Sequence, residues 1–434
     1  MVKVLQTLVI QPVYRRARRE TLAAHGERER SGALAWCARR IWRDNLWSAI
    51  NGAVDTELRA LAWKFAEEAG LPPGTPAVAA RNRPQKLEYE PAGRWRAAAL
   101  GSHATNHYAV TTTGDVVCWG ARTKYTVVGP DDAITPVRVM GLAGPATAVA
   151  PGRSHACALL QSGGVQCWGR SDSGQLGASD VRNRMGPVIP GLSATAIASG
   201  ADFSCALGQG GGVTCWGENG RGELGDGTTT KRAVPTAVLG LSSGVRSLRV
   251  YDRTVCAVLA RGEAYCWGET PGPLWSPGFL SRKQPTEFDF LKGMVDVSLG
   301  RTACGRSANG AVSCTDCYSS ETCRRTLDGR EMFPLSLGEK AGSLAGGYDS
   351  ACAVVGDGDV ACWGTGHRGT PRAPYDASRA PLRVPGLGKV VELSAGQSSF
   401  CARVVDGTVW CWGDRYLGDE RGASSEVPVR VVMD

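Results

Sequence analysis

The sequence predicts an all-β fold, a seven-bladed β-propeller of four-stranded antiparallel blades. Three observations support this prediction: a tripeptide that recurs seven times, four short β-type runs in each repeat, and turn residues between the runs. Repeats of about 40–50 residues with four strands each are typical of propeller blades. Repeats made of two helices would show apolar residues at helical spacing, and that pattern is missing here.

The tripeptide Cys-Trp-Gly marks the period of the repeat. A degenerate copy begins at Cys314, where Thr315 and Asp316 replace Trp and Gly. Successive copies are 48–51 residues apart, so the seven units have nearly the same length. The six complete copies begin at Cys118, Cys167, Cys215, Cys266, Cys362 and Cys411.

Other landmarks keep the phase of this repeat. A proline follows each tripeptide by 17–20 residues, and most of these prolines precede a short apolar run such as residues 137–139. Residues 84–90 resemble this run, which gives eight such runs for seven sets of the others. The surplus run predicts that one terminus closes the ring beside the other, with Leu87 or Tyr89 paired near residues 429–431.

Six units contain two cysteines ten residues apart, with a glycine-containing turn between them. A three-residue hairpin loop with glycine in the left-handed position places the two cysteines opposite each other, within reach of a disulfide. Buried free thiols are an alternative, and zinc is disfavoured because ligands opposed in pairs do not close a four-ligand site. The pairs are Cys157 and Cys167, Cys205 and Cys215, Cys256 and Cys266, Cys304 and Cys314, Cys352 and Cys362, and Cys401 and Cys411.

The remaining cysteines break the pattern. Cys317 and Cys323 lie six residues apart in a polar stretch, and we expect a local seventh bridge between them. Cys118 has Tyr108 at the site where the other units have a second cysteine. A tether between Cys118 and Cys37 is a further possibility.

The repeats resemble those of the regulator of chromosome condensation family, in particular its bacterial, Cys-Trp-Gly-rich members. The resemblance rests on Gly-x-x-His-x-Cys-Ala-Leu at residues 152–159, Gly-Val-x-Cys-Trp-Gly at residues 164–169 and Gly-Gln-Leu-Gly at residues 174–177. A second good copy covers residues 212–217 and 222–225. The resemblance extends over residues 84–434 and implies a seven-bladed propeller that presents loops to a protein partner.

Catalytic and cofactor motifs are missing from the repeats. His155 stands where the resembled family has a histidine before the cysteine strand, and a structural hydrogen bond is its expected role. The Ser154-His155 pair is no catalytic dyad, because neighbours on a strand point apart. The glycine-rich turns lack the lysine and the helix of a phosphate loop. We expect no enzymatic activity, no cofactor and no metal.

The tryptophan of each tripeptide points to the sheet face opposite its cysteine. Six regular copies at blade spacing indicate packing between neighbouring blades rather than an aromatic ligand cage. These residues are Trp119, Trp168, Trp216, Trp267, Trp363 and Trp412.

Residues 1–83 form a separate basic segment. Residues 1–100 carry a net charge of +7, against +1 for residues 101–434, so the propeller lacks the clustered positive charge of a nucleic-acid interface. Residues 44–69 predict an amphipathic helix, and the Pro- and Gly-rich stretch after it reads as a linker. No stretch is apolar and long enough to cross a membrane as a helix.

Paired cysteines indicate an extracytoplasmic protein, secreted or at the cell surface, although no signal peptide is visible. A cytoplasmic protein with reduced thiols is the alternative. We expect a monomeric, non-enzymatic scaffold for an unidentified protein partner, with a secreted inhibitor as its sharper form. Guanine-nucleotide exchange on a small GTPase is the alternative function. The candidate interaction residues follow the tripeptides: Arg170, Asp172, Glu218, Arg221, His367, Arg368, Arg415 and Tyr416.

Overall fold

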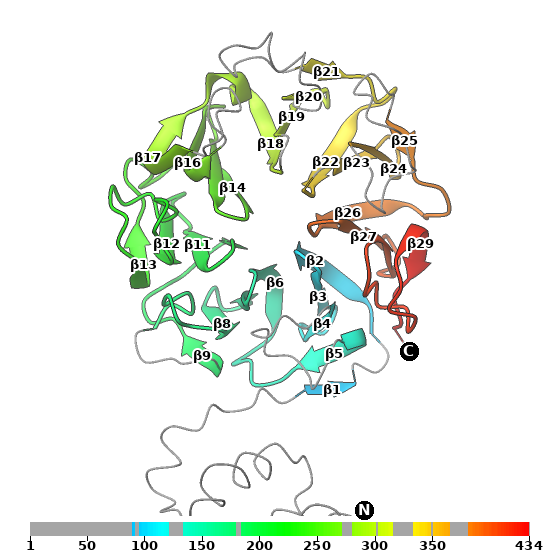
Figure 1. Cartoon of the computed structure of the whole chain (residues 1–434), viewed down its shortest axis with the longest axis horizontal. Helices are drawn as coiled ribbons and strands as arrows, with labels where there is room; N and C mark the ends of the chain where they lie inside the picture. Colours follow the sequence, from blue (N-terminus) through cyan, green and yellow to red (C-terminus); the bar gives the residue numbers. More distant parts are fainter. Residues whose placement is uncertain are drawn as a thin grey trace, which may run out of the picture. The chain divides into compact units, whose positions relative to one another are not determined.

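The computed structural model describes residues 89–91, 95–120, 133–178, 184–270, 280–300, 303–315, 333–348, 350–364 and 381–433. These residues form seven antiparallel sheets arranged around a central axis, which confirms the predicted propeller (Figure 1). Each blade is built from consecutive strands of the chain. The predicted helix at residues 44–69 and the linker after it lie outside the described residues and stay predictions.

The four strands of each blade run in order from the axis to the rim, so that equivalent strands occupy equivalent places (Figure 1). The first strands are β2 (Ala97–His103), β6 (Ala146–Pro151), β10 (Ala196–Ser199), β14 (Val245–Tyr251), β18 (Met294–Ser298), β22 (Ala341–Gly346) and β26 (Val390–Ala395). The second strands are β3 (Asn106–Thr111), β7 (His155–Leu160), β11 (Phe203–Leu207), β15 (Thr254–Leu259), β19 (Cys304–Ser307), β23 (Ser350–Val355) and β27 (Ser399–Val404).

The third strands carry the Cys-Trp-Gly tripeptides, except that β20 ends at Cys314 of the degenerate copy. These strands are β4 (Val116–Gly120), β8 (Val165–Gly169), β12 (Val213–Gly217), β16 (Ala264–Thr270), β20 (Val312–Cys314), β24 (Asp359–Gly364) and β28 (Val409–Gly413). The outer, fourth strands are β5 (Ala133–Val139), β9 (Arg184–Val188), β13 (Arg232–Ala237), β17 (Leu280–Glu287), β21 (Phe333–Leu335), β25 (Leu382–Arg383) and β29 (Ser425–Arg430). A single 3-10 turn, η3 (Asp289–Leu291), follows β17 in the described part of the chain.

Six cross-strand disulfides join the second and third strands of blades 2 to 7. Their S–S distances are 2.05–2.11 Å and their Cα atoms lie 4.0–4.1 Å apart. The cysteines face each other directly in the ladder, for example Cys205 opposite Cys215, because the hairpin turn fixes the register. The six predicted pairings are therefore confirmed, and such bonds are typical of proteins from an oxidising compartment.

Blade 1 departs from this pattern. Cys118 faces Tyr108 as predicted, and it is a buried free thiol; Cys37, its other proposed partner, lies outside the described residues. Burial raises the pKa of the Cys118 thiol well above its ordinary value. Cys317 and Cys323 lie outside the described residues, and their bridge stays a prediction.

The surplus strand, β1 (Tyr89–Pro91), adds a fifth strand to the outer edge of blade 1. Its register places Tyr89 opposite Val139 in β5, so the predicted pairing near residues 429–431 is wrong. Blade 7 takes its fourth strand from residues 425–430, and β1 extends the free edge of the neighbouring blade instead. The ring is closed by backbone hydrogen bonds, from Trp95 N to Met433 O (3.0 Å) and from Ala97 N to Gly407 O (2.9 Å).

The tryptophans of the tripeptides pack between blades as predicted. Each lies in a hydrophobic cluster with residues of the preceding blade, and Trp119 of blade 1 lies with Val409 and Leu417 of blade 7. Trp216, Trp267 and Trp412 are fully buried. Because a four-stranded sheet cannot cover its own apolar faces, each blade depends on its neighbours.

Backbone hydrogen bonds also join the turns between first and second strands near the axis. Arg153 N donates to Ala201 O (3.1 Å), and Ala201 N donates to Asp252 O (2.7 Å). Blades 6, 7 and 1 repeat this arrangement, from Tyr348 N to Gln397 O and from Gln397 N to Ala104 O, at 2.8 Å each. We call these linked turns the axial ring.

The axial ring requires glycine where a turn approaches the next blade. A Cβ atom on Gly200 would collide with the Asp252 carbonyl oxygen and with the Phe203 ring. We therefore expect Gly200→Ala to lower the free energy of unfolding by about 1–3 kcal/mol, as overpacking does in other proteins. The matched control is Gly210→Ala in the same blade, where a Cβ atom would meet nothing within 4 Å. Denaturant unfolding of both variants checks this, and equal stabilities would contradict it.

Candidate interaction surface

Two kinds of loop emerge on the same face of the propeller. The turns between first and second strands lie beside the loops between third and fourth strands. Arg170 N donates to Ser154 O, Glu218 N to Asp202 O, and Glu269 N to Arg253 O, at 2.9–3.0 Å. We call this the loop face, and it carries the predicted interaction residues of the described blades.

The blade 3 loop is organised by a fully buried asparagine, Asn219. Its Nδ2 donates to Asp226 Oδ1 (3.1 Å) and to the carbonyl oxygens of Thr228 (3.3 Å) and Thr230 (3.0 Å). Its Oδ1 accepts a hydrogen bond from Leu224 N (3.0 Å). One side chain thus connects both ends of the loop and holds its path.

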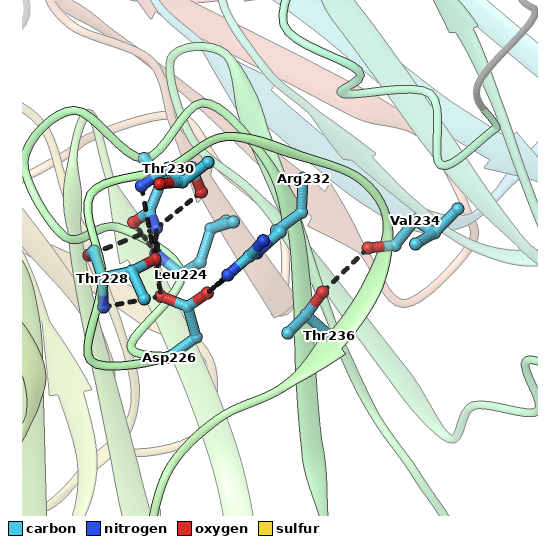
Figure 2. Close-up of polar contacts among 8 residues, drawn as sticks. Leu224, Asp226, Thr228, Thr230, Arg232, Val234 and Thr236 are labelled. Atoms are coloured by element: carbon cyan, nitrogen blue, oxygen red, sulfur yellow. Dashed lines mark hydrogen bonds and ion pairs between the residues drawn. The ribbon is translucent and has the colours of Figure 1, made fainter.

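Asp226 holds the other half of this network (Figure 2). Its Oδ1 accepts from Thr228 N (2.9 Å) and Thr228 Oγ1 (2.7 Å), and its Oδ2 accepts from Arg232 Nε (3.0 Å). Burial raises the pKa of the Asp226 carboxyl, but these hydrogen bonds outweigh it, and the pKa lies below the ordinary value. Both carboxylate oxygens accept hydrogen bonds from residues of the loop and of β13, so Asp226 is a structural residue.

The loops of blades 2 and 3 are joined to each other. Ser173 Oγ donates to Glu218 Oε2 (2.8 Å), and Lys231 Nζ donates to Asp172 O (3.2 Å). Arg170 forms an ion pair with Asp172. Burial raises the pKa of Glu218, but the hydrogen bonds from Ser173 and nearby backbone amides bring it below the ordinary value. The structure therefore brings Arg170, Asp172 and Glu218 together.

The other predicted interaction residues are placed differently. Arg221 is exposed at the tip of the blade 3 loop. Arg415 and Tyr416 lie on the corresponding loop of blade 7, where Tyr416 has a left-handed backbone with φ 64°. His367 and Arg368 lie outside the described residues. Sequence reasoning missed Asn219, Asp226 and Lys231, although Asp226-Gly227-Thr228 has the composition of an Asx turn.

The Gly-x-Leu-Gly segments, residues 174–177 and 222–225, join each loop to the next blade. Leu176 and Leu224 are fully buried. The indole Nε1 of Trp216 donates to Gln175 O (3.0 Å), and that of Trp267 donates to Glu223 O (2.9 Å). The two turns make the same hydrogen bond, which fixes the loop face against the body of the propeller.

The buried histidines have structural roles. His155 Nε2 hydrogen bonds with Ser204 Oγ of the next blade (2.7 Å), which confirms the predicted role. Ser399 and His107 make the equivalent contact between blades 7 and 1 (3.1 Å), with the two residue types exchanged. Burial lowers the pKa of His155 to about 3 and that of His107 to about 4, so both are neutral at pH 7.

The axial end of the loop face is also polar. Arg153 of blade 2 forms an ion pair with Asp252 of blade 4 (2.8 Å), and Ser154 Oγ donates to Asp202 Oδ1 (2.9 Å). No three His, Cys, Asp or Glu side chains converge as metal ligands within the described residues. The described residues also include no helix that could cross a membrane.

Glu223 and Gln175 occupy the same place in neighbouring blades. Gln175 Oε1 accepts from Ser173 N (2.9 Å), and Glu223 Oε2 accepts from Arg221 N (2.7 Å). Glu223 Oε1 is buried without a hydrogen-bond donor among the described residues, 3.8 Å from Arg253 Nη1. Burial raises the pKa of the Glu223 carboxyl, and the hydrogen bond and Arg253 offset this only in part.

We expect Glu223→Gln to stabilise the fold at pH 7 by about 1 kcal/mol, because it removes a buried, incompletely paired charge. A raised pKa in the folded chain favours folding at low pH, and this contribution is lost as pH rises through that pKa. The gain in melting temperature should therefore shrink as pH falls toward 4.5, the ordinary value.

The matched control is Gln175→Glu, which should lower the melting temperature at pH 7 and recover as pH falls. Thermal unfolding of both variants between pH 4.5 and 8 measures the effect. A pH-independent difference between Glu223→Gln and the parent chain would contradict it.

Sequence comparisons identify the repeat. Residues 146–175 and 194–223 match the model of the regulator of chromosome condensation (RCC1) repeat, and residues 162–207 match a second model of that repeat. These matches lie within blades 2 and 3. A comparison with curated proteins found no match. The bacterial origin stays a prediction.

Comparison with solved structures shows the same fold. Yeast RCC1 (Prp20) in its complex with Kap60 is 18% identical, with a TM-score of 0.62, and the match covers 81% of this chain and 90% of that chain. Prp20p from Saccharomyces cerevisiae is 19% identical, also with a TM-score of 0.62, over 78% and 87% of the two chains. The chain is a seven-bladed propeller, and within it residues 146–223 match the regulator of chromosome condensation (RCC1) repeat.

Proposed function

We propose that this chain is a non-enzymatic protein-binding scaffold whose binding surface is the loop face of blades 2 and 3. The observation that supports this most is the pair of cross-blade hydrogen bonds, from Ser173 to Glu218 and from Lys231 to Asp172. Together with the buried Asn219, they hold exposed charged side chains in a fixed arrangement. A preorganised surface loses little conformational entropy on binding.

The chemistry of the loops supports binding rather than catalysis. The carboxylate of Asp226 and the amide of Asn219 are occupied by hydrogen bonds within the loop. The exposed groups, Asp172, Arg221 and Lys231, carry mixed charges, which is typical of the polar rim of a protein interface. Such groups set orientation and association rate.

The disulfides support a location outside the cytoplasm, as a secreted or cell-surface protein. The narrower form of the proposal is a secreted inhibitor. Rigid loops on a stapled scaffold suit that role, because inhibitors of standard interface size bind tightly when their contact surface is preformed.

A photo-cross-linking amino acid at Arg221 should capture the partner from the native surroundings, whereas the same group at Lys292, after η3, should not.

The affinity of the captured protein for the purified chain is then measured. We expect Arg221→Glu with Lys231→Glu to weaken its affinity about tenfold, because two favourable interface charges become repulsive. Arg261→Glu with Lys292→Glu is the charge-matched control on other loops. Equal weakening by both pairs would contradict the proposed surface.

Non-reducing peptide mapping of the protein from its native source tests the location. Six linked pairs of cysteine peptides are expected, each joining residues ten apart. Rapid alkylation of the same twelve cysteines in the native extract would instead place the working protein in a reducing compartment.

A further inference from the structure

The outer edge of blade 7 repeats the sequence of the edge that binds β1. In blade 1, β1 pairs antiparallel with β5, with Tyr89 opposite Val139, Glu90 opposite Arg138 and Pro91 opposite Val137. This acceptor edge reads Pro-Val-Arg-Val at residues 136–139. The same four residue types occur at residues 428–431, in and directly after β29.

The two edges also have the same position in their blades. In both, the arginine lies opposite the residue before the tripeptide cysteine, and the preceding valine lies opposite that cysteine. The pairs are Val117–Arg138 and Cys118–Val137 in blade 1, and Trp410–Arg430 and Cys411–Val429 in blade 7. The backbone that accepts β1 in blade 1 is therefore reproduced in blade 7.

Within the part of the chain that the structure describes, the blade 7 edge is open, whereas the blade 1 edge is occupied. Among the described residues no strand pairs with the outer side of β29. Arg430 is exposed, and Val427 is 56% exposed. An unpaired edge strand offers backbone donors and acceptors to another extended chain.

We propose that the outer edge of β29 binds an extended, acidic segment of a partner protein by strand addition. The segment runs antiparallel to β29 and places an acidic residue opposite Arg430, as β1 places Glu90 opposite Arg138. Its pattern is that of residues 87–91, Leu-Glu-Tyr-Glu-Pro, with acidic residues between apolar or aromatic ones. Main-chain hydrogen bonds give affinity, and the acidic residue gives specificity.

A second copy of this chain is not the expected occupant. Its residues 89–91 already pair within their own blade 1, and an intramolecular partner has the higher effective concentration. The arginine and the length of the strand together restrict which edges can bind this segment. Blade 6 also carries an arginine, Arg383 opposite Ala361, but β25 is only two residues long and Arg383 already pairs with Glu339 and Asp359. Blade 4 carries Glu287 at the equivalent place, opposite Tyr265, and an acidic segment would be repelled there.

The probe is a synthetic peptide with the sequence of residues 84–94, added to the full chain. Hydrogen exchange detected by mass spectrometry should show slower exchange in residues 425–433 as the peptide is titrated. Arg430→Glu should weaken this protection at least tenfold, and the peptide carrying Glu90→Lys should restore it on that variant. Arg261→Glu, the same charge change on an exposed turn, should leave the affinity within twofold.

Several results would overturn the proposal. Absence of protection at residues 425–433 at millimolar peptide is one, and equal binding by Arg430→Glu is another. Protection confined to residues 133–139 would mean that the peptide only replaces β1. A rise in molecular mass of the chain alone, lost in Arg430→Glu, would assign the edge to a second copy. The Arg221→Glu, Lys231→Glu variant should bind the peptide normally, so this test is independent of the loop face.

Discussion

The packing of a tryptophan from six of the seven blades against the preceding blade is the constraint on which the rest of the structure depends. The indole fills the space between two sheets. In blades 3 and 4 its Nε1 also donates a hydrogen bond to a backbone carbonyl of the neighbouring Gly-x-Leu-Gly segment. That segment lies within the loop of the preceding blade. The same contact therefore sets the spacing of the sheets, the direction of the loops and the position of the loop face.

Equivalent positions on the second strands of neighbouring blades are joined by different residues. Blades 2 and 3 are joined by His155 and Ser204, and blades 7 and 1 by Ser399 and His107. The hydrogen bond connects the same two positions in both joints, with the histidine and the serine exchanged. Other joints place apolar residues there, such as Phe203 beside Val255, so the geometry tolerates either solution when both partners change together.

Sequence patterns predicted the elements that depend on local spacing. The seven blades, the six disulfides and the tryptophan packing all follow from the period of the repeat and the register of one hairpin. The partner of β1 was predicted wrongly because the surplus strand was expected to close the ring beside the C-terminus, whereas blade 7 has its own fourth strand and β1 extends blade 1. The Asn219 network and the axial ring were missed because they rest on main-chain atoms, which leave little trace in residue types.

The ten-residue separation of the paired cysteines bears on how the protein is made. A chain with sixteen cysteines has a very large number of ways to pair them wrongly. Here both members of each bond belong to one hairpin, which forms within microseconds and brings them together without the rest of the ring. Because the chain is synthesised from its N-terminus, each blade can form its disulfide before the cysteine pair of the next blade is made. The correct pairing is thus specified by local sequence within each hairpin.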